Sequence, residues 1–194
     1  MSLQLATAAG AVPVSALAAA HAAVPPGVVT LRSARAADAA AIHALVESHL
    51  DEGHLLPRTR QDVETQATRF VVATDGTRIL ACAELAPLST RVAEVRSLVV
   101  HADARHAGVG RQLVDELARR ARVQGFDTLC AFTHGAGYFV GLGFSLVPHH
   151  WLGEKIVADC QGCALFRRCG QSAVAVSLTD TGRAGRLPRT RGVE

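Results

Sequence analysis

A glycine-punctuated turn in the middle of the chain has the residue types of an anion-binding site. Arg105-His106-Ala107-Gly108-Val109-Gly110 follows the apolar segment Leu98–Val100 and runs into a stretch with helical spacing. A helix N-terminus presents unpaired N–H groups and a partial positive charge, and glycines let this backbone approach a phosphate closely. No Gly-Lys-Ser/Thr follows, and the glycine spacing differs from the dinucleotide fingerprint. The alternative interpretation is a tight turn that binds nothing.

Three of the five cysteines form a second cluster that could do chemistry. Cys160, Cys163 and Cys169 lie close together in the sequence, whereas Cys82 and Cys130 lie in apolar runs and are expected in the core. A Cys-x-x-Cys pair with a third cysteine is typical of zinc knuckles, and zinc usually takes four ligands. The candidates for the fourth ligand are His149, His150 and Asp159. Redox sensing and plain packing are the other two interpretations.

The elements that must position these residues alternate between strand and helix patterns. Asp75-Gly76-Thr77 between two apolar runs predicts a hairpin, and Thr59 with Asp62 predicts a capping box at a helix start. Gly125 is placed to end the helix behind the glycine turn. The apolar spacing predicts strands at 28–31, 69–73, 79–85, 92–100, 128–133, 144–147 and 173–178, and helices at 37–50, from 59, 109–124 and 137–142. This order predicts an α/β fold in which helices flank one mixed central sheet.

Composition divides the chain into one domain with two tails. Residues 1–27 are rich in alanine, residues 28–178 hold all the predicted elements, and residues 179–194 form a basic tail. Hydrophobic residues make up 49% of the chain and aromatics 4%, so valine, leucine and alanine must fill the core. The net charge of +3 comes without a nucleic-acid-reading motif, and no apolar run is long enough for a membrane span. An odd cysteine count suits a reducing compartment. We therefore expect a cytoplasmic protein without nucleic-acid or membrane partners.

In its context, the glycine turn resembles the pyrophosphate-binding motif of the GNAT superfamily of acetyltransferases. Leu142-Gly143-Phe144 is similar to the helix-to-strand turn found downstream in that family. The resemblance covers roughly residues 28–178 and implies a GNAT-type mixed sheet and acetyl-CoA as co-substrate. It implies that coenzyme A is held by Leu98, Val99 and Val100, pairing with the pantetheine arm, and by the backbone of Arg105, His106, Ala107, Gly108, Val109, Gly110 and Arg111.

Smaller features resemble the acetyltransferase domain of N-acetylglutamate synthases. They are Leu56-Pro57-Arg58-Thr59-Arg60, Arg91-Val92-Ala93-Glu94, the aromatic segment Tyr138–Phe144 and the tail with the cysteines. Gly153 and Gly170-Gln171 depart from that tail's pattern. The amino-acid-kinase domain of the long synthases, with its arginine-feedback site, is not expected here. The resemblance implies that Arg58, Arg60 and Arg91 clamp the carboxylates of an acidic substrate, for which the planar guanidinium is well suited. The alternative interpretation is that these three residues are ordinary surface arginines that bind no substrate.

Acetyl transfer requires a neutral amine, so a base or a proton path is expected. Glu94 is the candidate base, acting directly or through water, and His101 and His134 are the alternative bases. The alternative interpretation of Glu94 is an ordinary carboxylate at a strand end without a catalytic role. The position of the general-acid tyrosine of many GNAT enzymes holds Phe139, next to Tyr138. We expect a direct transfer without an acyl-enzyme, because Cys130 lies in an apolar strand, and an oxyanion stabilised by backbone N–H groups.

These inferences predict an enzyme that acetylates the amine of a small acidic metabolite, L-glutamate first, as in arginine biosynthesis. The alternatives are another amine acceptor (an amino acid, a polyamine, an antibiotic or a protein N-terminus) and a non-catalytic acetyl-CoA-binding or metal-sensing module. A polyamine site should be lined with carboxylates, and the candidate segments contain few. A homodimer is compatible with the resemblance, since dimers are common in the superfamily.

Overall fold

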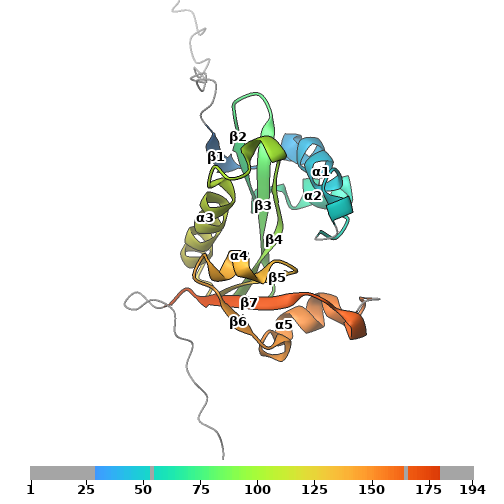
Figure 1. The fold of residues 1–194 in the computed structure, drawn as a ribbon, viewed down its shortest axis with the longest axis vertical. Coiled ribbons are helices and arrows are strands. Elements are labelled where there is room, and N and C mark those ends of the chain that lie inside the picture. Colours follow the sequence, from blue (N-terminus) through green and yellow to red (C-terminus); the bar gives the residue numbers. More distant parts are fainter. Residues whose placement is uncertain (1–28, 53–54, 164–165, 180–194) are drawn as a thin grey trace, which may run out of the picture.

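Seven strands form one mixed sheet in the order β1-β2-β3-β4-β5-β7-β6 (Figure 1). The computed structural model describes residues 29–52, 55–163 and 166–179, so the predicted tails lie outside the described part, apart from Thr179. The strands are β1 Thr30–Ser33, β2 Phe70–Thr74, β3 Ile79–Pro87, β4 Val92–Val100, β5 Thr128–Thr133, β6 Ser145–Val147 and β7 Ser172–Ser177. All neighbours pair antiparallel except β4 and β5, which are parallel.

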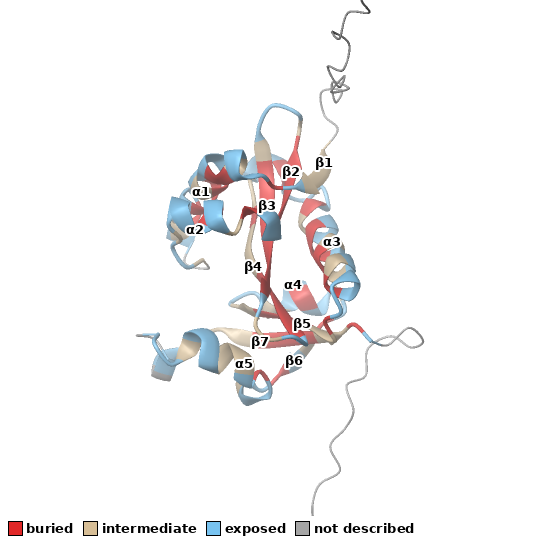
Figure 2. Ribbon diagram, turned by 180° about the vertical axis from the view of Figure 1, so that it is seen from behind, coloured by how far each residue is buried: buried red, intermediate tan, exposed pale blue. Residues whose placement is uncertain are grey.

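Helices cover both faces of this sheet, and the two-residue period of the strands explains how. On β2, Val71 and Ala73 belong to the core shared with helix α3, whereas Phe70 and Val72 belong to the core shared with α1. Figure 2 shows the buried residues gathered along the sheet and on its helix contacts. The helices are α1 Ala39–Glu47, α2 Arg60–Thr65, α3 Val109–Val123, α4 Ala136–Val140 and α5 Gly153–Lys155, which continues into a π-helical turn, Ile156–Cys160. Short 3-10 turns lie at Ala36–Asp38, Leu50–Glu52, Ala67–Arg69, Ala102–Ala104, His149–Trp151 and Phe166–Arg168.

The two central strands separate halfway along their length. β4 pairs with β5 only from Val92 to Glu94, opposite Thr128 to Cys130, and the described residues form no further pair between them. β4 is also irregular there, because its register with β3 shifts opposite Cys82 and Glu84 and Ser97 adopts a φ of 49°. A bulge of this kind bends a strand away from its neighbour. The separation opens the sheet at its centre and leaves the edge of β4 from Val95 to Val100 without a strand partner on that side.

The predicted fold class and element order are confirmed, with small shifts at the element ends. The capping box is present: the Thr59 hydroxyl accepts from the Asp62 N–H and the Asp62 side chain accepts from the Thr59 N–H. Gly76 and Gly125 have φ values of 93° and 83°, as a hairpin turn and a helix end require. The first predicted helix is shorter than expected, because a 3-10 turn replaces its first residues. Within the described ranges, no helix is long and apolar enough to cross a membrane.

Candidate active site

The first of two adjoining cavities lies at the N-terminus of α3. It measures about 660 Å³ and is lined by the glycine turn, by α4 and by β4. Gly108 precedes the helix with a φ of 76°, and an added Cβ there would meet nothing within 4 Å. The N-cap residue is Gly108 itself, which has no side chain to cap the first helical N–H groups. Arg105 and Arg111 flank the turn, tied to the carbonyls of Val100 and Gly141. An open helix N-terminus between two arginines fits a pyrophosphate.

Tyr138 closes this cavity on the α4 side. A Cβ added to Gly110 would lie 2.6 Å from the Tyr138 hydroxyl, so the turn must have a glycine here for the tyrosine to approach. Burial raises the pKa of the Tyr138 hydroxyl, which keeps it protonated at neutral pH. Tyr138 also lines the second cavity, together with Leu98, Val100 and Arg105. These four residues mark the junction at which a group could pass from one cavity to the other.

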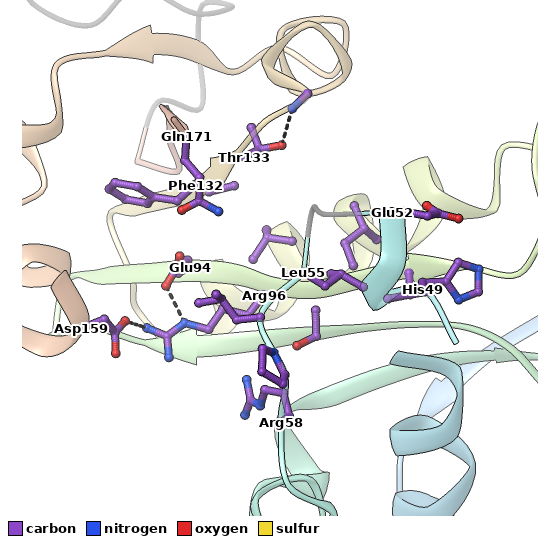
Figure 3. A pocket seen from close by; sticks show the side chains of 18 of the residues that line it. His49, Glu52, Leu55, Arg58, Glu94, Arg96, Phe132, Thr133, Asp159 and Gln171 are labelled. Carbon is purple, nitrogen blue, oxygen red and sulfur yellow. Dashed lines mark hydrogen bonds and ion pairs between the residues drawn. The ribbon is translucent and has the colours of Figure 1, made fainter. Parts of the chain in front are cut away.

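The second cavity measures about 740 Å³ and occupies the gap between β4 and β5 (Figure 3). The loop before α2 closes it on one side, and the end of β5 closes it on the other together with the C-terminal segment. In the lining, this segment consists of Lys155, Asp159, Gly162, Cys163 and Gln171. Four cations line it, and four acidic residues balance them. These residues are Arg58, Arg96, Arg105 and Lys155, with Glu52, Asp62, Glu94 and Asp159. A cavity lined by several cations suits an acceptor with more than one negative group.

Arg58 is fixed in this cavity by the fold. Its Nη1 donates to Oε2 of Glu84 at 2.6 Å and its Nη2 donates to Oε1 of Gln66 at 2.9 Å. Glu84 is fully buried, and its second oxygen, Oε1, has no hydrogen-bond partner among the described residues. The guanidinium also lies 5.9 Å from the centre of the Phe70 ring. A guanidinium held on its rear side keeps the remaining N–H groups for a ligand.

A network of four charged residues lines the same cavity and begins next to Arg58, because Arg96 lies opposite Glu84 in the register of β3 and β4. Oε2 of Glu94 accepts from Arg96 Nε at 2.5 Å and from Lys155 Nζ at 2.9 Å. The Lys155 ammonium also pairs with Oε1 of Glu94 at 2.8 Å and with Asp159 at 2.9 Å. Figure 3 shows Arg96 between Glu94 and Asp159, and its Nη2 donates to the Asp159 carboxylate. The network joins β4 to the C-terminal segment.

The other residues predicted for the substrate and the base lie outside the cavity. Arg60 is exposed on the first turn of α2, and Arg91 pairs with Asp127 at the far end of β4. His101 and His134 are likewise absent from the described lining. The structure therefore brings together Arg58 and Glu94 and places Arg60 and Arg91 elsewhere.

The sequence analysis missed Arg96, Lys155 and Glu84. Arg96 and Glu84 each interrupt an apolar strand pattern, and a charge inside a central strand must find a partner. That signal was available in the sequence. The sequence contained no such signal for Lys155, because only the tertiary structure brings its ammonium to β4. Its side chain is 11% exposed and lies over the Phe132 ring.

The zinc prediction is not supported. Within the described part of the chain, no three His, Cys, Asp or Glu side chains are placed to hold a metal ion. Cys160, Cys163 and Cys169 are free thiols, and the last two are exposed. Burial raises the pKa of the Cys160 thiol. Cys163 contributes to the lining of the larger cavity, so this segment packs beside the site without forming a metal centre.

Comparison with known proteins decides the family. Residues 36–138 match the model of the acetyltransferase (GNAT) family. The chain belongs to this family. It is therefore an N-acetyltransferase that uses acetyl-CoA.

Several relatives are similar over part or all of their length. An uncharacterized N-acetyltransferase, CT2212 of Chlorobaculum tepidum, is 28% identical over 80% of this chain and all of its own. An amino-acid acetyltransferase of Ectopseudomonas mendocina is 32% identical over 59% of this chain, which spans only 27% of that relative. Among solved structures, N-acetylglutamate synthase of Neisseria gonorrhoeae with coenzyme A and N-acetyl-glutamate aligns at a TM-score of 0.71 and 23% identity, over 79% of this chain and 36% of its own. Rv2747 of Mycobacterium tuberculosis, in complex with CoA and NLQ, aligns at a TM-score of 0.65 and 22% identity, over 76% of this chain and 98% of its own. At these identities the structures show the shared fold.

Proposed function

We propose that this acetyltransferase acetylates the α-amine of an acidic amino acid, L-glutamate first. The observation that carries the proposal is the cavity beside β4, which meets the coenzyme cavity at Leu98 and Val100 and holds two separate cationic groups. Arg58 forms one, and Arg96 with Lys155 forms the other. Two carboxylates on one acceptor match two cationic sites. The amino-acid acetyltransferase relatives support the same substrate class.

The proposed reaction is one direct transfer. Acetyl-CoA supplies the thioester, and the free edge of β4 offers backbone N–H groups to its arm and carbonyl oxygen. The amine lone pair attacks the carbonyl carbon, the C–N bond forms, and the C–S bond breaks so that coenzyme A leaves as a thiolate. The amine loses one proton and the thiolate gains one, which leaves the reaction balanced. Cys130 does not serve as a nucleophile, because burial raises the pKa of its thiol.

Glu94 enters the proposal with a different role from that of a base. Both its oxygens already pair with Arg96 or Lys155, and the residue is 3% exposed. We therefore assign Glu94 to positioning these two cations, and the amine proton to water in the cavity. Asp62 and Glu52 also line the cavity, and Glu52 pairs with Arg105.

A thiol-release assay with acetyl-CoA tests the proposal. The acceptors are L-glutamate, L-aspartate, L-glutamine, spermidine and a peptide with a free N-terminus. A preference for L-glutamate of at least about ten-fold in kcat/KM over L-glutamine is expected, since one ion pair at a desolvated site is worth about 1.4 kcal/mol or more. Turnover of spermidine or the peptide in preference to every amino acid would replace the substrate class and keep the family. The proposed cytoplasmic role in arginine biosynthesis stands or falls with the glutamate result.

A further inference from the structure

The carboxylate of Asp159 is the feature of the second cavity that the proposed reaction does not use. It lies at the wall of the cavity, paired with the Arg96 guanidinium and, at 2.9 Å, with the Lys155 ammonium. We propose that Arg96 and Lys155 form the subsite for the acceptor's side-chain carboxylate, and that Asp159 occupies this subsite until the acceptor displaces it. The inference rests on the proposed function and names the substrate class as dicarboxylic amino acids.

Charge balance shows why a carboxylate must leave when another arrives. Arg96 and Lys155 carry two positive charges, and Glu94 and Asp159 carry two negative ones, so the network is neutral. Glu84, buried on β3 opposite Arg96, adds a further negative charge that is paired with Arg58. An incoming carboxylate would give this neutral network a net negative charge, so binding is favoured when one resident carboxylate leaves the two cations.

Burial identifies Asp159 as the carboxylate that can leave. The Glu94 side chain is 3% exposed and bonds to both cations from within the sheet. The Asp159 side chain is 37% exposed and lies on the π-helical turn, where its neighbour Val157 is 70% exposed. Since water can solvate a displaced Asp159 but not a displaced Glu94, exchange at Asp159 costs far less.

The position along β4 assigns this subsite to the side-chain carboxylate rather than the α-carboxylate. The acceptor amine must reach the junction of the two cavities, at Leu98. Arg96 lies two residues earlier on the strand, about 7 Å away, and Lys155 reaches to Glu94, about 13 Å away. The group bound by Lys155 is therefore the one farther from the amine. Arg58, which is held by Glu84 directly opposite Arg96, lies nearer the junction than the contact of Lys155 with Glu94, so we assign it the α-carboxylate that every amino acid shares.

Three acceptors and three variants test the inference, because L-glutamate, L-glutamine and L-norvaline differ chiefly in the group at the end of the side chain. Asp159→Asn should lower the KM for L-glutamate about three- to five-fold and leave the KM values for the other two unchanged, since it removes the partly exposed carboxylate that competes for Arg96 and Lys155. Lys155→Met should lower kcat/KM for L-glutamate about ten-fold or more and spare L-norvaline. As the matched control, Arg58→Lys should weaken the binding of all three acceptors by a similar factor.

The outcomes separate this inference from the proposed function. If the wild-type enzyme acetylates L-glutamate but Asp159→Asn raises its KM, or changes all three acceptors by one factor, Asp159 does not occupy the subsite. If Arg58→Lys selectively affects L-glutamate and Lys155→Met affects all three, the two subsites are exchanged and the assignment is wrong. If the wild-type enzyme turns over none of the three, the proposed function fails, and the inference fails with it.

Discussion

At the scale of single residues, the cavity beside β4 depends on charges that hold one another in place. Arg58 is oriented by a fully buried carboxylate, and Arg96 and Lys155 are oriented by Glu94. Removing one member of a buried pair leaves the other uncompensated, which costs about 3–5 kcal/mol. Substitutions that keep the charge and change the geometry are therefore the informative ones here.

Arg58→Lys should raise the KM for the acidic acceptor about ten-fold, because lysine keeps the charge but loses the fork that binds a carboxylate with two hydrogen bonds. The KM for acetyl-CoA should stay within about two-fold of wild type. Arg60→Lys, two residues away and outside the cavity, is the control and should change neither value. Initial-rate kinetics with both substrates measure this. Equal effects on both KM values would exclude a role for Arg58 in acceptor binding.

Glu94→Gln should distinguish a positioning residue from a base. We expect kcat/KM for L-glutamate to fall about ten-fold or more, because Arg96 and Lys155 lose their shared partner. The pH profile of kcat should keep its rise on the acidic side, since the amine itself must lose its proton. A profile that becomes flat over that range would instead identify Glu94 as the base and restore the role expected from the sequence.

At the scale of elements, the cavity at the N-terminus of α3, where we propose that coenzyme A binds, depends on how α3 and α4 meet. Helix α3 begins with an open first turn at Gly108, and α4 places the Tyr138 hydroxyl against Gly110. The apolar face of α3, with Leu113, Leu117 and Ala121 fully buried, fixes this turn relative to β4. Glycine is needed at Gly108 for its backbone conformation and at Gly110 because α4 approaches α3 there.

Gly110→Ala should raise the KM for acetyl-CoA about five-fold or more, because the new methyl group would lie 2.6 Å from the Tyr138 hydroxyl and force the ring to move. Combining it with Tyr138→Phe removes that oxygen, and the next ring atom lies 3.6 Å away. The double variant should therefore have a lower KM for acetyl-CoA than Gly110→Ala alone. Initial-rate kinetics with varied acetyl-CoA measure both. If the double variant gives no recovery, the contact does not control the turn.

At the scale of the whole molecule, apolar clusters on both faces of the sheet and at its β6–β7 end support the site. Cys82 lies in the cluster under α1 and α2, and Cys130 lies in the cluster formed with Val147 and Leu152. Burial raises the pKa of the Cys82 thiol to about 12 and raises that of Cys130 as well. Both thiols must therefore stay protonated in the folded state at alkaline pH.

This linkage predicts a loss of stability at alkaline pH. The unfolded thiols ionise above about pH 8.5 while the folded ones do not, so the unfolded state binds fewer protons there. The contribution of each protonated thiol to the free energy of unfolding is complete below about pH 8.5. It falls by about 1.4 kcal/mol per pH unit as the pH rises toward the folded-state pKa. Urea unfolding at pH 7.5, 8.5 and 9.5 measures it. The Cys82→Ala/Cys130→Ala variant should show a shallower decline, and an identical slope would contradict the argument.

The sequence by itself determined the elements, the fold class and the glycine turn before α3, because each of these depends on local pattern. Period-two strands, the capping box at Thr59 and the glycines near α3 leave their signals within a few neighbouring residues. The acceptor site depends on contacts between distant segments. Lys155 reaches Glu94 across 61 positions, and Arg58 reaches Glu84 across 26. Only the tertiary structure decided that Arg58 enters the cavity while Arg60 and Arg91 do not, because the separation of β4 from β5 determines which side chains face the gap.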